Sequence, residues 1–323
     1  MPDPSPATST SAPDAVTPGG FATPTLLLGP LRRPRQMLQA QSYAGHASVH
    51  DEQVAGDLGL SGAPIEGPTH FSQFDPLLVR LFGPTWFERG CISAHFQNMC
   101  VEGDEVRAGV LHDGTDRQRA TIDAEKADGT PVLTGTAHVG DDQDTEVRAR
   151  LERARSRPLE RPVILDQLQV GQRGTAREQV TMGMDTHMGE LYPFTLADKL
   201  EHITEPSPWY RDASPWGAPV IPTEMVSVLA MATSRQAGFQ VRQPSVGLFI
   251  DLEIRMLAGP LLVDRTYQLE REIVALSESR RTESYWTLTT VLDADDAPVA
   301  EVLLHQGVFK DSYPDHPDRQ QRP

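Results

Sequence analysis

The sequence has few cysteines, no long apolar run and no segment that resembles a secretion signal. Its two cysteines, Cys91 and Cys100, fall on one expected strand. There they lie roughly 30 Å apart on opposite faces, so they cannot form a disulfide. No apolar stretch reaches the ~18 residues of a membrane span, and no basic segment precedes an apolar core. We therefore expect a cytoplasmic protein with reduced thiols.

Basic residues are also scarce: 29 Lys and Arg stand against 45 Asp and Glu, and the formal charge of the 323 residues is −16. This charge opposes binding to nucleic acid or to an anionic membrane. The histidines and cysteines lack metal-site spacing, and no glycine-rich nucleotide fingerprint occurs, so we expect neither metal nor cofactor. Only a local basic cluster could bind an anionic carrier such as coenzyme A. The two candidates are Arg32, Arg33 and Arg35, and Arg271, Arg280 and Arg281.

Composition divides the chain into two folded parts with polar ends. Both ends contain Pro and lack an apolar period, which is typical of disordered tails. An Arg/Glu-rich run broken by Pro158 lies near the middle and predicts an interdomain linker or an exposed helix. The expected division is a tail at 1–24, a first domain at 25–145, a linker at 146–162, a second domain at 163–310 and a tail at 311–323.

The first domain is organised around residues 61–100. A turn of sequence GAPIEGP at 62–68 precedes apolar residues spaced three and four apart, which predict a buried helix over 71–82. Pro76 either kinks this helix or begins a second segment that Asp75 caps. Other apolar runs separated by turn dipeptides predict the remaining elements. These are a strand at 35–43, a short helix at 51–58, and strands at 91–101, 105–112, 118–127 and 131–139.

The second domain repeats this pattern. A turn of sequence GAPVIP at 217–222 echoes the first turn, about half the chain later, and an apolar helix over 223–237 follows it. Thr223 is the expected N-cap of that helix. Predicted strands follow at 246–256, 265–276, 282–293 and 297–309. We therefore predict a duplicated α+β unit, in which each half packs a long central helix on an antiparallel sheet.

The order of turn, buried helix and four strands, present twice, resembles the tandem (double) hotdog fold of the MaoC-like (R)-specific enoyl-CoA hydratases and dehydratases. The resemblance covers roughly residues 30–310. In that family an Asp-x-Asn-Pro-(aliphatic)-His motif supplies an acid/base pair. The glycine that opens the central helix donates its N–H to the thioester oxygen.

Transferred to this sequence, the resemblance implies that His50 is the acid/base and that Gly67, one residue earlier than the family spacing, is the oxyanion donor. Pro64 and Ile65 match the family turn. The family Asp, Asn and Pro are replaced, and His50 therefore needs another orienting group. The replacements are Gly45, Ala47 and Ser48, and the nearby orienting candidates are Asp51, Glu66, His46 and His70.

Other polar residues close to this motif are candidates for the same site. Glu66 and Asp51 are expected to be catalytic with His50 and Gly67. The second domain lacks an Asp–His pair before its turn and is expected to be mainly structural. The expected substrate-binding residues are Pro64, Ile65, His70, His95 and Asn98.

Three functions remain open. The first is a hydratase or dehydratase that acts on a 2-enoyl or 3-hydroxyacyl thioester of coenzyme A or an acyl carrier protein. The second is a thioesterase, in which Glu66 or Asp51 activates water. The third is a catalytically silent protein that binds acyl thioesters, because most of the family motif is replaced. A monomer, acting as a pseudo-dimer, and a homodimer both fit a duplicated fold.

Overall fold

The structure is a computed structural model that describes residues 23–41, 48–116, 118–212 and 214–318. The expected N-terminal tail as far as residue 22, the motif positions Gly45, His46 and Ala47, and the last residues of the C-terminal tail lie outside the described residues. No helix in the described ranges is long and apolar enough to cross a membrane.

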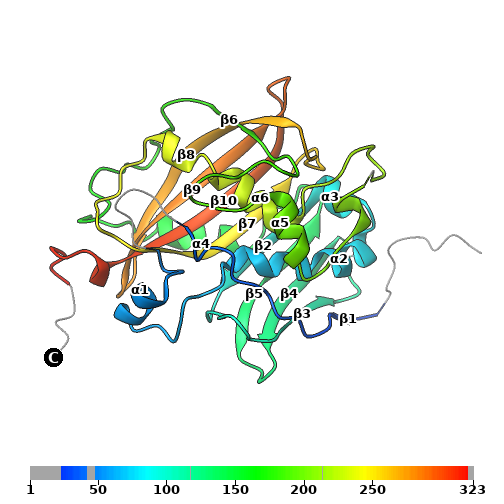
Figure 1. Ribbon diagram of the computed structural model, residues 1–323, viewed down its shortest axis with the longest axis horizontal. Helices are drawn as coiled ribbons and strands as arrows, with labels where there is room; N and C mark the ends of the chain where they lie inside the picture. Colours follow the sequence, from blue (N-terminus) through cyan, green and yellow to red (C-terminus); the bar gives the residue numbers. More distant parts are fainter. Residues whose placement is uncertain (1–22, 42–47, 117, 213, 319–323) are drawn as a thin grey trace, which may run out of the picture.

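The strands form one antiparallel sheet of ten that both halves share (Figure 1). Its order is β1-β3-β4-β5-β2-β7-β10-β9-β8-β6. The first half contributes β1 (Thr25–Leu28), β2 (Gly90–Phe96), β3 (Val106–His112), β4 (Arg119–Lys126) and β5 (Pro131–Val139). The second half contributes β6 (Glu178–Thr181), β7 (Gly247–Met256), β8 (Thr266–Glu278), β9 (Thr282–Leu292) and β10 (Pro298–Phe309).

The predicted duplication is confirmed by this strand order. Outward from the central pair, β2, β5, β4, β3 and β1 correspond to β7, β10, β9, β8 and β6. The central β2–β7 pair is antiparallel, with Ser93 opposite Glu253. The two sheets are thereby joined edge to edge about an approximate two-fold axis.

The predicted strands at 91–139 and 246–309 correspond to observed strands, because alternation and turn dipeptides are local signals. The strand predicted at 35–43 is wrong, since the described residues 35–41 form no strand and β1 lies earlier in the chain. β1 and β6 are the two edges of the sheet, and each has only four residues. Strands this short contain too little alternation to be recognised before their partners are known.

Central helices lie on one face of the sheet, but neither is long. In the first half η1 (Gly67–Gln73) is a 3₁₀ helix, and α2 (Asp75–Phe82) begins one residue after Phe74. Pro76 explains the break, because proline lacks the N–H that a continuous helix requires. In the second half α6 (Thr223–Met231) packs against η1 and gives way to η3 (Ser234–Ala237). Thr223 is the first residue of α6 and not its N-cap, which is Pro222.

The remaining helices are shorter or peripheral. The helix predicted at 51–58 is confirmed as α1, with Asp51 as its N-cap. The bounds of these remaining helices are α1 (Glu52–Asp57), α3 (Thr85–Arg89), α4 (Glu146–Arg155), α5 (Leu196–His202), η2 (Pro208–Tyr210) and η4 (Lys310–Ser312).

The expected linker at 146–162 contains α4, which packs on the sheet face opposite the central helices. Thr145 caps α4 by accepting the N–H of Arg148 at 3.2 Å. Val147 and Leu151 are buried in one apolar cluster with Trp286. One side of α4 is thus part of the core, while its other side carries the arginines and glutamates that made the segment read as a linker.

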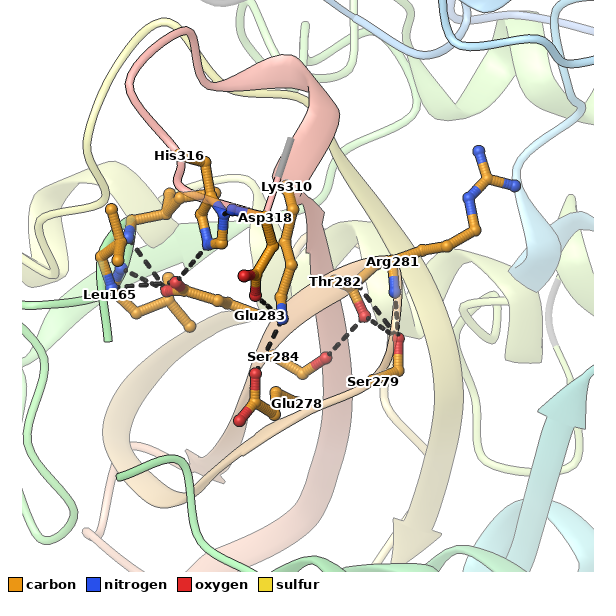
Figure 2. A network of polar contacts seen from close by, with 12 residues as sticks. Leu165, Glu278, Ser279, Arg281, Thr282, Glu283, Ser284, Lys310, His316 and Asp318 are labelled. Carbon is orange, nitrogen blue, oxygen red and sulfur yellow. Dashed lines mark hydrogen bonds and ion pairs between the residues drawn. The ribbon is translucent and has the colours of Figure 1, made fainter. Parts of the chain in front are cut away.

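The expected C-terminal tail is packed as far as Asp318, so the prediction of disorder is wrong for residues 311–318. Tyr313 and His316 are buried. Figure 2 shows the reason: the carboxylate of buried Glu283 lies between His316 and the segment 163–165. It accepts the N–H groups of Val163, Ile164 and Leu165 at 2.8–3.0 Å, and His316 Nε2 lies 3.0 Å away. A single carboxylate on β9 therefore fixes two segments that are distant in sequence.

Candidate active site

A cavity of about 490 Å³ lies between the two halves. The first half contributes Leu38, Gln41, Ser48, Val49, His50, Pro64, Ile65, Glu66, Gly67, His70, Phe96, Gln97, Asn98, Met99, Cys100 and Val132. The second half contributes Leu191, Tyr192, Met231, Ser234, Arg235, Phe239, Gln240, Val241, Gln243, Ser245, Gly247, Leu248, Phe249, Arg271, Tyr285, Thr287, Gln306, Gly307 and Val308. The volume suits a small-molecule ligand, and one chain supplies both walls.

His50 enters this cavity with its tautomer set by the main chain. Its Nδ1 lies 2.6 Å from the carbonyl oxygen of Pro64, to which Gln36 Nε2 also donates at 2.5 Å. A carbonyl oxygen only accepts, so His50 Nδ1 carries the proton and Nε2 is the basic nitrogen of the neutral ring. Burial lowers the pKa of His50, and the main-chain hydrogen bond opposes this in part. The orienting group is therefore the Pro64 carbonyl and not Asp51, Glu66 or His70, while the fourth candidate, His46, lies outside the described residues.

The segment that carries His50 is tied to the second half through a short chain of hydrogen bonds. The N–H of His50 donates to Ser48 Oγ at 3.1 Å, and Ser48 Oγ donates to Gln41 Oε1 at 2.7 Å. Gln41 Nε2 then donates to the carbonyl of Leu191 at 2.8 Å. These contacts hold one cavity wall against the other.

Gly67 begins η1 at the cavity wall. A Cβ at this position would lie 2.7 Å from the ring of Phe96, so glycine is required by the packing of β2 under the helix. The N–H of Gly67 has no hydrogen-bond partner among the described residues, and Pro68 has no N–H. Gly67 can therefore donate one backbone hydrogen bond to a ligand oxygen in the cavity.

Glu66 lies between Pro64–Ile65 and Gly67 and is a cavity residue that can hold a proton near neutrality. Burial raises the pKa of its carboxyl to about 7, against the opposing effects of Lys199 and of the Tyr192 hydroxyl. Tyr192 Oη donates to Glu66 Oε1 at 3.1 Å. Glu66 is thus available as an acid and as a base at physiological pH.

A buried ion pair joins two residues of the second half, Lys199 on α5 and Glu224 on α6. Lys199 Nζ lies 3.5 Å from Glu224 Oε1, and the two side chains are 7% and 1% exposed. Ser72 Oγ donates to Glu224 Oε2 at 2.7 Å, and Lys199 Nζ donates to Thr69 Oγ1 at 3.3 Å.

His70, Asn98, Pro64 and Ile65, which were expected to bind substrate, also line the cavity. His70 is buried, and burial together with the charge of Lys199 lowers its pKa to about 4, so its ring is neutral at pH 7. Asn98 is exposed and donates through Nδ2 to the carbonyl of Pro131 at 2.8 Å.

Two predicted site residues do not reach the cavity. Asp51 is exposed, and its carboxylate accepts the N–H of Val54 as the cap of α1. His95 lies on the other face of β2, since successive strand residues alternate and Phe96 is the one that lines the cavity. His95 Nδ1 instead lies 2.7 Å from Asp251, to which His305 Nδ1 also approaches at 2.6 Å.

Sequence reasoning missed Lys199, Glu224 and Tyr192. One signal was present: Glu224 is the only charged residue of the apolar α6 sequence TEMVSVLAM, and a lone carboxylate there needs a buried partner. The partner is distant in the chain, so the sequence could not identify it.

The duplication places a counterpart of this cavity at the start of α6, and side chains fill that second position. Thr223 opens α6 as Gly67 opens η1, and only about 10 Å³ of space remains beside it. Trp86 Nε1 and the Tyr210 hydroxyl each donate to buried Asp75 at 2.9 Å, and Thr223 Oγ1 donates to it at 2.6 Å. Aromatic side chains and a fully hydrogen-bonded carboxylate thus occupy the second position.

Of the six arginines in the two expected basic clusters, Arg32, Arg33, Arg35 and Arg271 are paired with carboxylates. Arg281 instead donates to the carbonyl of Leu58 and lies over the Phe309 ring. Arg271 is buried, and its guanidinium lies 2.5 Å from Glu178. The remaining pairs are Arg32 with Glu205, Arg33 with Glu105 and Arg35 with Glu102. Among the described residues, no group of three or more His, Cys, Asp or Glu is arranged to hold a metal ion.

Comparison with known proteins identifies the fold. No family model and no curated protein sequence matches the chain. Among solved structures, a conserved hypothetical protein from Mycobacterium tuberculosis with a double hotdog fold has a TM-score of 0.55 at 12% identity over 89% of this chain and 96% of its own. A protein described as a MaoC domain dehydratase from Chloroflexus aurantiacus J-10-fl has a TM-score of 0.50 at 14% identity over 92% and 99%. The fold is a double hotdog, and at such identities the likeness extends to the fold alone.

Proposed function

We propose that this double hotdog chain is a hydro-lyase that adds water to a 2-enoyl thioester, or removes it from the 3-hydroxyacyl thioester. The acyl group is carried by coenzyme A or an acyl carrier protein. One observation supports this proposal above the others: His50, Glu66 and Gly67 line the same cavity. A base, an acid and an oxyanion donor are the three groups that this reaction needs.

In the hydration direction, His50 Nε2 takes a proton from water while the water oxygen bonds to C3 of the enoyl group. The electron pair of the C2=C3 bond moves toward C1, and the thioester oxygen becomes an enolate oxyanion that accepts the Gly67 N–H. Glu66 then gives its proton to C2, which completes the 3-hydroxyacyl thioester. The proton on His50 returns to Glu66 through solvent, and dehydration is the reverse sequence.

Each role agrees with a feature of the residue. The Pro64 carbonyl keeps the His50 proton on Nδ1, so Nε2 is free to accept one. The pKa of Glu66 of about 7 makes its proton available for transfer. Gly67 lacks a hydrogen-bond partner among the described residues for its N–H. Because both cavity walls come from one chain, the reaction needs no second copy.

We expect a bell-shaped pH dependence of kcat/KM for hydration. His50 must be neutral to act as the base, and burial holds its pKa below the ordinary 6.5. Activity is therefore lost as the pH falls through this lowered pKa of His50. Glu66 must be protonated, so activity is lost as the pH rises through about 7. The optimum therefore lies on the acid side of neutrality. Rates with 2-enoyl-CoA from pH 5 to 9 test this, and a rate that keeps rising from pH 7 to 9 contradicts the role of Glu66 as an acid.

Thioester hydrolysis is the second candidate, because Glu66 is adjacent to the Gly67 N–H and could direct water at the carbonyl carbon. Reaction in water labelled with ¹⁸O separates the candidates. Label in the C3 hydroxyl of an intact thioester supports the hydro-lyase. Label in a free carboxylic acid, with release of thiol, supports the thioesterase. Tight thioester binding without either product identifies a silent binding protein.

A further inference from the structure

One loop of the second half contacts the segments that carry the proposed acid and the proposed base. This loop lies between β6 and α5 and contributes Leu191 and Tyr192 to the cavity lining. The Tyr192 hydroxyl donates to Glu66 Oε1 at 3.1 Å. The carbonyl of Leu191 accepts Gln41 Nε2 at 2.8 Å, at one end of the hydrogen bonds that lead to the main chain of His50. Two adjacent residues of one half thus hold both proposed catalytic segments of the other.

The conformation of this loop is restrained by its own contacts. Pro193 restricts the backbone of Tyr192 to extended conformations. The N–H of Phe194 donates to the Tyr192 carbonyl at 2.8 Å, and the N–H of Met188 donates to the Phe194 carbonyl at 3.2 Å. Tyr192 is 3% exposed, and its ring packs edge-on against the Phe194 ring with 6.1 Å between the centroids. A buried ring in a restrained loop loses little further freedom when its hydroxyl binds Glu66.

The hydrogen bond from Tyr192 distinguishes the two oxygens of the Glu66 carboxyl group. A hydroxyl that donates to Oε1 makes this oxygen the acceptor, and in a neutral carboxyl group the carbonyl oxygen is the acceptor. The acid proton therefore resides on Oε2. The carboxyl group cannot rotate without breaking the hydrogen bond, so Glu66 presents its proton from one fixed position.

We propose that Tyr192 is a positioning residue that acts through Glu66: its hydroxyl, supplied by the second half, fixes the Glu66 carboxyl group with the transferable proton on Oε2. The catalytic meaning of this inference rests on the proposed function. The hydrogen bond itself joins two side chains of the free protein and can be measured without any substrate.

The charges around Glu66 set the direction in which the loss of the hydroxyl acts. Burial raises the pKa of Glu66 to about 7, and Lys199 on α5 and the Tyr192 hydroxyl lower it, while Glu224 on α6 raises it. His70 on η1 is neutral at pH 7, because burial lowers its pKa to about 4. A hydroxyl donates more strongly to a carboxylate than to a carboxylic acid. Removal of the hydroxyl alone should therefore raise the pKa of Glu66.

Tyr192→Phe tests the proposal, because it removes the hydroxyl and keeps the ring that packs against Phe194. We expect kcat for hydration to fall by roughly 10-fold to 100-fold, since Glu66 loses its fixed orientation, and KM to change much less. The alkaline limb of kcat/KM should move up by about one pH unit, because the ionised carboxylate has lost a hydrogen bond. A change that only loosened the packing would lower kcat without moving this limb.

A direct titration of Glu66 gives a second readout that needs no turnover. Glutamate labelled with ¹³C at the carboxyl carbon gives one NMR signal per residue, and the signal lost in Glu66→Gln assigns Glu66. Its midpoint should rise by about one pH unit in Tyr192→Phe. Tyr210→Phe is the matched control. Tyr210 also donates from its hydroxyl to a buried carboxylate, that of Asp75 at 2.9 Å, but it does not line the cavity. The Glu66 midpoint and the kinetics should therefore stay unchanged in this control.

A lower kcat together with a higher Glu66 midpoint in Tyr192→Phe supports the inference. A folded Tyr192→Phe protein, as judged by circular dichroism, overturns it if kcat is unchanged or if the midpoint stays in place. A raised midpoint in Tyr192→Phe, when the wild-type protein has no hydratase activity, would reject the proposed function and the catalytic meaning of Tyr192. The hydrogen bond to Glu66 would then stand as a structural contact.

Discussion

Replacing His50 with alanine should lower kcat/KM for hydration by about 10²–10⁴-fold, the usual contribution of a positioned acid/base group. The variant loses the basic Nε2 while the Gly67 N–H and Glu66 remain, so binding of the thioester should change much less than turnover. The fold should persist, because His50 is half-buried and its ring contacts only the Pro64 carbonyl and the Gln36 amide among the described residues, and these two groups stay hydrogen-bonded to each other without it.

Steady-state kinetics and thermal unfolding of His50→Ala check this result. His202→Ala is the matched control, since it removes an exposed histidine at the end of α5 and should keep wild-type kinetics. Added imidazole should restore part of the activity of His50→Ala if the lost group transfers a proton. A folded His50→Ala protein with unchanged kcat/KM would remove His50 from the mechanism.

Among the variants proposed here, Glu283→Ala should lower the free energy of unfolding the most. The change leaves three N–H groups of the segment 163–165 and the His316 ring without the carboxylate that they share. Orphaned buried donors cost about 1–3 kcal/mol each when they stay buried, so a loss of about 3 kcal/mol is expected. At roughly 2–4 °C per kcal/mol, the Tm should fall by about 10 °C.

Differential scanning calorimetry measures the fall, and limited proteolysis should show new cleavage near residue 163 and in 311–318. Glu278→Ala is the control: its ion pair with Lys310 is half-exposed, and Lys310 keeps Asp318 as a partner, so the loss should stay within about 1 kcal/mol. Equal melting temperatures for the two variants would show that the Glu283 contacts do not hold these segments.

Features with a local cause were predictable from the sequence. The strands at 91–139 and 246–309 and the two turns come from alternation and from Gly and Pro, and together they predicted the duplicated α+β fold. The turn residues Pro64 to Gly67 lie at the cavity because a turn before a central helix stays at the helix end wherever the helix packs.

Features that depend on distant partners were not predictable. The prediction that His95 binds substrate was wrong because alternate residues of β2 face opposite sides of the sheet, and the sequence does not show which side the central helices cover. Phe96 faces the cavity, so His95 faces away from it. The prediction of a disordered tail was wrong for residues 311–318 because their order depends on a contact with Glu283, a residue of β9. Lys199 and Glu224 were missed because their hydrogen bonds to Thr69 and Ser72 of the first half exist only once the two halves are joined.

The most direct test of the proposed function is the reaction of the pure protein with crotonyl-CoA and with a longer 2-enoyl-CoA. The absorbance of the conjugated thioester and the appearance of free thiol are followed together. We predict that the absorbance falls without release of thiol, and that His50→Ala abolishes the fall. Release of thiol, or unchanged absorbance with both substrates at an enzyme concentration that saturates them, would contradict the assignment as a hydro-lyase.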